Sequence, residues 1–72
     1  MYKASIYRQT KGDVEVAMVS QQKAKQELQR FKLRFMRKRG SFRFYVLSAF
    51  KRVVGEACFE GSEIRYILYY RQ

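Results

Sequence analysis

Apolar and polar residues alternate over the first part of the chain, which predicts two strands. The segment from Tyr2 to Gln9 has Tyr2, Ala4 and Ile6 on one face and Lys3, Ser5 and Tyr7 on the other, which is the pattern of a strand. Thr10-Lys11-Gly12-Asp13 follows as a turn in which Gly12 can adopt a positive φ. The β-branched run Val14 to Val19 alternates again and is predicted to return antiparallel to the first strand. We expect this hairpin to present one apolar face, made of Tyr2, Ala4, Ile6, Val14, Val16 and Met18.

From Ser20 to Gly40 the spacing becomes helical. Ser20 is a suitable N-cap, because its hydroxyl can accept a hydrogen bond from an amide of the first turn. Gly40 suits the left-handed residue that commonly follows a helix. The pattern therefore predicts one helix of about 30 Å, whose stripe lies on the apolar face of the hairpin. That stripe recurs at offsets of four, three and four and consists of Ala24, Leu28, Phe31 and Phe35.

The rest of the chain alternates again and predicts three more strands. Ser41 to Ser48 is the first, and Val54 to Phe59 and Glu63 to Tyr70 form a second hairpin around Glu60-Gly61-Ser62. Residues 49–55 fit either the start of the next strand or one helical turn. Strict alternation in the last strand separates two faces: Ile64, Tyr66, Leu68 and Tyr70 on one, and Arg65, Ile67, Tyr69 and Arg71 on the other.

These elements predict a single α+β domain over residues 1–72. Its antiparallel sheet has about five strands in the order β-β-α-β-β-β, with one long basic amphipathic helix packed on one face. This order and the size of the chain resemble those of some small phage-encoded anti-CRISPR proteins. The resemblance concerns topology and length, and it implies a regulator that binds another protein.

Composition removes most catalytic chemistry. The chain has no His and one Cys, which excludes Ser–His and Cys–His nucleophilic pairs and a cysteine zinc cluster. Its four glycines are isolated, so no phosphate-binding loop is present. We therefore predict no enzyme, no catalytic residue, no metal site and no cofactor. The absence of a signal-peptide pattern and of a long apolar run predicts no membrane span, and the lone Cys58 favours a reducing, cytoplasmic location.

Charge points to a polyanionic partner. Sixteen Lys and Arg stand against six Asp and Glu, a net charge of +10, and half of the basic residues lie between Ser20 and Gly40. A basic run is commonly only a solvated face, but here a single acid, Glu27, interrupts it, which favours phosphate binding. The predicted phosphate ligands are Lys23, Arg30, Arg34, Arg37, Lys38 and Arg39, supported by Arg43 and Arg65.

Tyrosines beside arginines suggest a second surface. Tyr7, Tyr45 and Tyr69 are predicted on the face of the sheet that the helix leaves uncovered. Such a face can stack on unpaired bases, and it can equally form a homodimer interface, because Tyr and Arg are enriched in both settings. A homodimer through the C-terminal strand is a further alternative.

The leading functional hypothesis is a small nucleic-acid-binding protein, with DNA favoured over RNA as the ligand of the basic helix. The alternative is a protein-binding regulator of the phage or mobile-element type, which docks on an acidic or nucleic-acid-binding surface of a host complex. Leu33 and Met36 lie away from the helix stripe, and they are the predicted protein contacts in that alternative.

Overall fold

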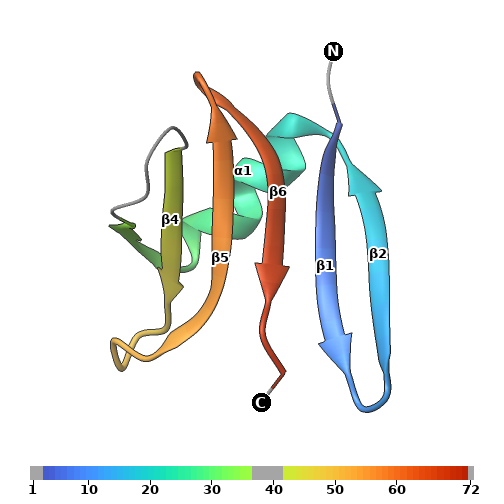
Figure 1. The fold of residues 1–72 in the computed structure, drawn as a ribbon. Coiled ribbons are helices and arrows are strands. Elements are labelled where there is room, and N and C mark those ends of the chain that lie inside the picture. The colour runs from blue at the N-terminus through green and yellow to red at the C-terminus, as the bar shows by residue number, and fades with distance from the viewer. Residues whose placement is uncertain (1–2, 37–41, 72) are drawn as a thin grey trace.

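The computed structural model describes residues 3–36 and 42–71, which form one mixed sheet with a helix on one side (Figure 1). The strand order is β2-β1-β6-β5-β4-β3. The prediction of an antiparallel sheet with about five strands is wrong, because the described residues form six strands and the pair β1–β6 is parallel. All other neighbours are antiparallel. The elements are β1 (Ala4–Thr10), β2 (Asp13–Val19), α1 (Gln21–Gln29), β3 (Lys32–Phe35), β4 (Phe42–Leu47), β5 (Val53–Glu60) and β6 (Glu63–Tyr69).

The predicted long helix is wrong. Ser20 is its N-cap as expected, with its Oγ accepting from the amide of Lys23 at 3.2 Å, but α1 ends at Gln29. The helical part contains mostly straight-chain residues with good helix propensity. Beyond Arg30 the sequence FKLRFM also alternates with a period of two, and this second pattern prevails.

Cross-strand contacts explain why residues 32–35 form β3 instead of two more helical turns. The rings of Phe35 and Phe44 meet edge to face at 5.5 Å, and Arg34 pairs directly with Tyr45 on β4. Such cross-strand pairs stabilise the β3–β4 hairpin. Two further helical turns without tertiary contacts would gain less stability. Gly40 and the basic residues Arg37 to Arg39, predicted at the end of the helix, lie outside the described residues.

The predicted turns are confirmed. Gly12 has φ 81° and Gly61 has φ 60°, the left-handed conformation that the two hairpins require. Residues 49–55, for which two structures were predicted, divide between a turn and a strand. The amide of Lys51 donates to the carbonyl of Ser48 at 2.9 Å, and β5 begins at Val53.

The core lies between α1 and the central strands, and the helix packs mainly on β6 and β1. Ala24 and Leu28 are the buried residues of α1. Figure 1 shows the helix behind the sheet, so that the opposite face carries no second layer among the described residues. The buried cluster consists of Ala4, Ile6, Ala24, Leu28, Val46, Val54, Ala57, Ile64 and Ile67.

Two of the six residues predicted on the apolar hairpin face pack against the helix, and one of the six, Tyr2, lies outside the described residues. Ala4 and Ile6 are buried there, but Val14, Val16 and Met18 are 51%, 56% and 58% exposed. The reason is the register of the hairpin. Ile6 pairs with Ala17, and the three exposed residues therefore point to the opposite side of the sheet.

A β-bulge reverses the faces predicted for the last strand. Cys58 pairs with Tyr66 and Phe59 pairs with Ile64, which leaves Arg65 as the extra residue on β6. Beyond the bulge, Ile67 therefore points toward the helix. Because β6 lies between β1 and β5, both of its edges are paired, and it offers no free edge to the homodimer predicted through the C-terminal strand.

Candidate nucleic-acid interface

The sheet surface opposite α1, which we call the tyrosine face, carries the residues most suited to binding. Two adjacent rows of directly paired residues cross it from β3 to β2. The first row is Arg34, Tyr45, Glu56, Leu68, Tyr7 and Val16. The second row is Met36, Arg43, Cys58, Tyr66, Ser5 and Met18. Basic residues thus lie at one end of the face, tyrosines in the middle and apolar residues at the other end.

Arg34 and Arg43 form the basic end. The guanidinium carbon of Arg34 lies 5.5 Å from the centre of the Tyr45 ring, a cation–π arrangement that holds the side chain against the sheet. The Nε of Arg43 is buried without a hydrogen-bond partner in the described part of the chain. Neither arginine forms an ion pair with a carboxylate of residues 3–36 or 42–71. Their charge is therefore not neutralised within this part of the fold.

Glu56 orients the tyrosines at the centre of the face. The hydroxyls of Tyr66 and Tyr70 donate to its two carboxylate oxygens at 3.3 and 3.2 Å. Tyr7 meets Tyr66 edge to face, with ring centres 6.2 Å apart. Burial and the Glu56 charge raise the pKa of both Tyr66 and Tyr70, so these rings remain neutral donors near neutral pH.

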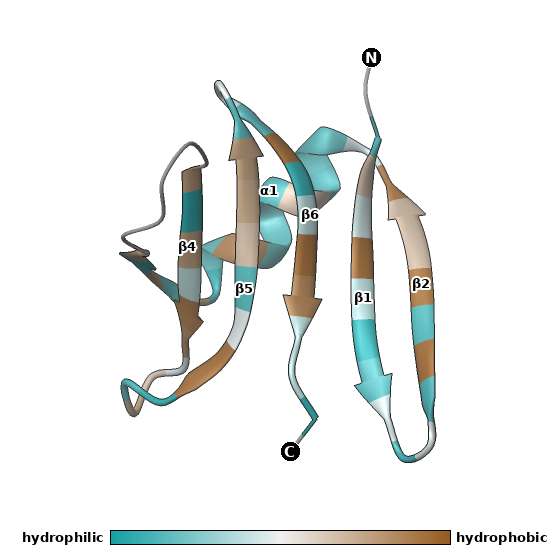
Figure 2. Cartoon of the chain, in the orientation of Figure 1, coloured by the Kyte–Doolittle hydropathy of each residue, from teal (hydrophilic) through white to brown (hydrophobic). Residues whose placement is uncertain are grey.

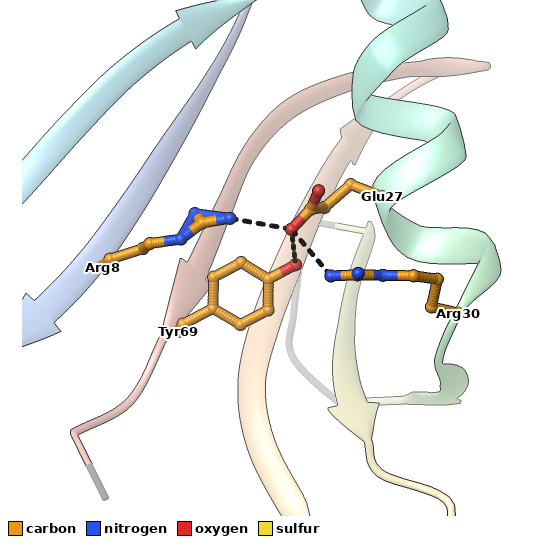
Figure 3. Close-up of polar contacts among 4 residues, drawn as sticks. All are labelled: Arg8, Glu27, Arg30 and Tyr69. Atoms are coloured by element: carbon orange, nitrogen blue, oxygen red, sulfur yellow. Dashed lines mark hydrogen bonds and ion pairs between the residues drawn. The ribbon is translucent and has the colours of Figure 1, made fainter.

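A second polar cluster lies on the helix side of the sheet (Figure 3). One oxygen of Glu27, on α1, accepts from Arg8 at 2.9 Å, from the Tyr69 hydroxyl at 2.9 Å and from Arg30 at 3.5 Å. The Arg8 guanidinium also lies 5.0 Å from the centre of the Tyr69 ring. These contacts join α1 to β1 and β6.

The Glu27 cluster stabilises the fold and does not resemble a binding site. Its two arginines neutralise the carboxylate within the molecule, and the Glu27 side chain is only 17% exposed. Burial, followed by the hydrogen bond to Glu27, raises the pKa of Tyr69 well above its ordinary value of 10.0. Tyr69 thus serves as a buried hydrogen-bond donor.

The structure disperses the predicted phosphate ligands. Arg34 and Arg43 share the tyrosine face, whereas Lys23 lies exposed on α1 and Arg30 pairs with Glu27 beyond the end of the helix. Arg65 lies at the bulge, with its Nε 3.6 Å from Glu60. Arg37, Lys38 and Arg39 lie outside the described residues. No single basic helix face exists, because α1 itself contains two lysines and one glutamate.

The predicted aromatic set is correct in part. Tyr7 and Tyr45 lie on the tyrosine face, whereas Tyr69 points to the helix and binds Glu27. Sequence reasoning missed Tyr66 and Tyr70 as members of the face, because strict alternation ignores the bulge at Arg65. The acidic residue Glu56, placed in the middle of an apolar strand, was the available signal for a polar partner there.

The predicted protein contacts do not share a surface. Leu33 is 39% exposed on the helix side of β3. Met36, one row beyond the strand, is only 6% exposed and lies on the tyrosine side. The change from helix to strand separates them, because residues three apart in a strand point to opposite faces.

No family model, curated protein or solved structure matches this chain significantly, and the function is therefore argued from the site itself. Within residues 3–36 and 42–71, the side chains include no group of three or more His, Cys, Asp or Glu placed to hold a metal ion. In the same two ranges, no helix is long and apolar enough to cross a membrane.

Proposed function

We propose that this protein binds single-stranded nucleic acid on the tyrosine face. The observation that carries the proposal is the position of Arg34 and Arg43, without ion pairs in the described part of the chain, beside tyrosines on an uncovered sheet. The net charge of +10 attracts any polyanion, but these two arginines direct the attraction to one surface.

The chemistry of the face favours single strands over duplexes. Tyr7, Tyr45 and Tyr66 are partly exposed, and an exposed ring can stack on an unpaired base for roughly 1–3 kcal/mol. The bases of a duplex are already stacked on one another and offer no such surface. Arg34 and Arg43 would hold the phosphates beside the stacked bases, without reading the base sequence.

The test is fluorescence anisotropy with labelled single-stranded and duplex DNA and RNA over a range of salt concentrations. We expect the double variant Arg34→Gln/Arg43→Gln to bind the single strand about tenfold or more weakly. The slope of log affinity against log salt should fall by about 1.4, because each phosphate contact to a single strand contributes about 0.7.

The matched control is Lys11→Gln/Arg52→Gln, which removes the same charge from two exposed turn residues. It should retain most of the affinity. Equal losses in the two double variants would contradict the proposal, because binding would then follow net charge alone. Tyr45→Leu should weaken single-strand binding and leave duplex binding unchanged.

An exposed apolar group on the helix side supports a second candidate, a regulator that binds another protein. Leu33, Phe35 and Phe42 are 39%, 53% and 62% exposed at the end of the sheet that α1 leaves uncovered. In this case Leu33→Ser/Phe35→Ser should abolish capture of a protein partner in a pull-down and leave nucleic-acid binding intact. Retained capture would exclude this surface.

A further inference from the structure

The two edges of the sheet differ in their protection against pairing with another strand. The outer strand β3 is four residues long and carries Lys32 and Arg34, two features that discourage pairing between edges. The outer strand β2 is seven residues long, with no Pro, Lys or Arg and an unbroken register against β1. Its charged residues are the acids Asp13 and Glu15, and the β2 edge is longer and less protected than the β3 edge.

The exposed residues of β2 form an apolar row on the tyrosine face. Val14, Val16 and Met18 are all more than half exposed. Figure 2 shows teal and brown bands alternating along the first part of this outer strand. Val16 pairs with Tyr7, and the Met18 sulfur lies 3.1 Å from the Ser5 hydroxyl, which places the row on this face.

The backbone of the same three residues points outward. The two-residue turn makes Thr10–Asp13 a hydrogen-bonded pair, so Val14, Val16 and Met18 direct their amides and carbonyls away from β1. The Asp13 carboxylate accepts from the Val14 amide at 2.8 Å. Val16, at the centre of the row, therefore presents its backbone to a further strand.

We propose that β2 pairs antiparallel with β2 of a second copy of this chain, about a two-fold axis at Val16. In this register Val16 meets Val16 of the second copy, and Val14 meets Met18. On the helix side Glu15 meets Ala17, so the acids face apolar residues and no like charges oppose each other. The tyrosine faces of the two copies then form one continuous surface.

Among symmetric contacts between sheet edges, charge favours β2 over β3. Two chains of net charge +10 repel each other, but β2 contains two acids, Asp13 and Glu15, and no base. A symmetric contact through β3 would bring Lys32 and Arg34 of both copies together. A contact of β2 with β3 would be head to tail and could grow into a filament, whereas a two-fold contact closes.

The first test is the oligomeric state, measured by sedimentation velocity and light scattering from low to high micromolar concentration. The unmodified protein should be a dimer. Val16→Lys should raise the dimer dissociation constant at least about tenfold, because it places two lysines directly opposite each other at the two-fold axis, with Cα atoms about 5.5 Å apart. The control variant is Phe50→Lys, which introduces the same charge at a turn residue that is 92% exposed and lies outside β2. This variant should remain dimeric. Circular dichroism checks that both variants are folded.

A cysteine variant tests the register independently. Residues in a hydrogen-bonded antiparallel pair have Cα atoms about 5.5 Å apart, within the range that a disulfide can bridge. Val16→Cys should therefore form a covalent dimer in a glutathione redox buffer, and Phe50→Cys should not. The native Cys58 is buried and present in both variants.

Three results would overturn the proposal: a wild-type monomer at every concentration, an unchanged dissociation constant in Val16→Lys, or oligomers that keep growing with concentration. None of them depends on nucleic acid. The Arg34→Gln/Arg43→Gln variant should remain dimeric, so the two proposals can fail separately.

Discussion

The two faces of the sheet each have one glutamate that accepts hydrogen bonds from tyrosine hydroxyls. On the helix side Glu27 binds Tyr69, and on the open side Glu56 binds Tyr66 and Tyr70. The difference lies in the arginines. Arg8 and Arg30 bind the Glu27 carboxylate, whereas no ion pair joins an arginine to Glu56 among residues 3–36 and 42–71.

This difference separates charge that holds the fold together from charge that is available to a ligand. Around Glu27 the two arginines neutralise the carboxylate, and the ion pair with Arg8 joins α1 to β1, so it strengthens the contact between helix and sheet. On the tyrosine face the acid orients the rings, and within residues 3–36 and 42–71 Arg34 and Arg43 have no carboxylate partner. A binding face on a small domain requires this kind of division, because the same charges cannot serve both purposes.

The largest expected difference in stability is between variants at Ile67 and Leu68, which are adjacent in sequence and lie on opposite faces of the sheet. Ile67 is fully buried under the helix, and truncation to Ala should lower the free energy of unfolding by about 2–5 kcal/mol, because it leaves a cavity. Leu68, next in sequence, lies partly exposed on the tyrosine face, and Leu68→Ala should cost about 1 kcal/mol. Urea unfolding measures both changes.

A domain of this size has a total stability of only about 4–11 kcal/mol, so Ile67→Ala could unfold it completely. Ile67→Val, with an expected loss of about 0.5–1.5 kcal/mol, then replaces it in the comparison. Equal losses at the two positions would mean that the tyrosine face is as deeply packed as the helix side, and the distinction between the faces would be wrong.

Replacement of Glu27 and of Glu56 by Gln should give a smaller difference in the free energy of unfolding. Glu27→Gln weakens contacts to two arginines and one hydroxyl, and it should destabilise the protein by about 1–3 kcal/mol. Glu56→Gln affects two longer hydroxyl contacts and should cost less than about 1 kcal/mol. Both variants add the same net charge, so thermal and urea unfolding report the difference in local contacts. A larger loss for Glu56→Gln would contradict the comparison.

Local patterns predicted most of the elements correctly. The alternation of residues 4–9, 14–19 and 63–69 and the turn glycines Gly12 and Gly61 correspond to observed strands and turns. The error in residues 30–36 arose because Phe31 and Phe35 satisfy a helical spacing while Leu33 between them satisfies a strand spacing. Only the long-range pairing of β3 with β4 decides between the two, and one segment considered alone does not contain that pairing.

The candidate site was harder to predict than the fold, because it depends on which face each side chain joins. One extra residue at Arg65 moves Tyr66 and Tyr70 to the open side and Tyr69 to the helix side. Likewise, the register of the first hairpin exposes Val14, Val16 and Met18. Composition predicted a basic, tyrosine-rich surface, but bulges and strand registers determine which residues lie on it.

The smallest expected effect is on the pH dependence of stability, which should differ between Tyr69 on the helix side and Tyr70 on the tyrosine face. The folded pKa of Tyr69 is raised above its unfolded value of 10.0 by burial and by the hydrogen bond to Glu27. The contribution of Tyr69 is therefore complete below pH 10 and is lost progressively as the pH rises above it, because the unfolded chain releases the proton first. The melting temperature should therefore fall as the pH rises above about 10. Tyr69→Phe should reduce this fall more than Tyr70→Phe does, because burial and a shorter hydrogen bond affect Tyr69 more strongly. Equal slopes in the two variants would show that the carboxylates on the two faces hold their tyrosines equally well.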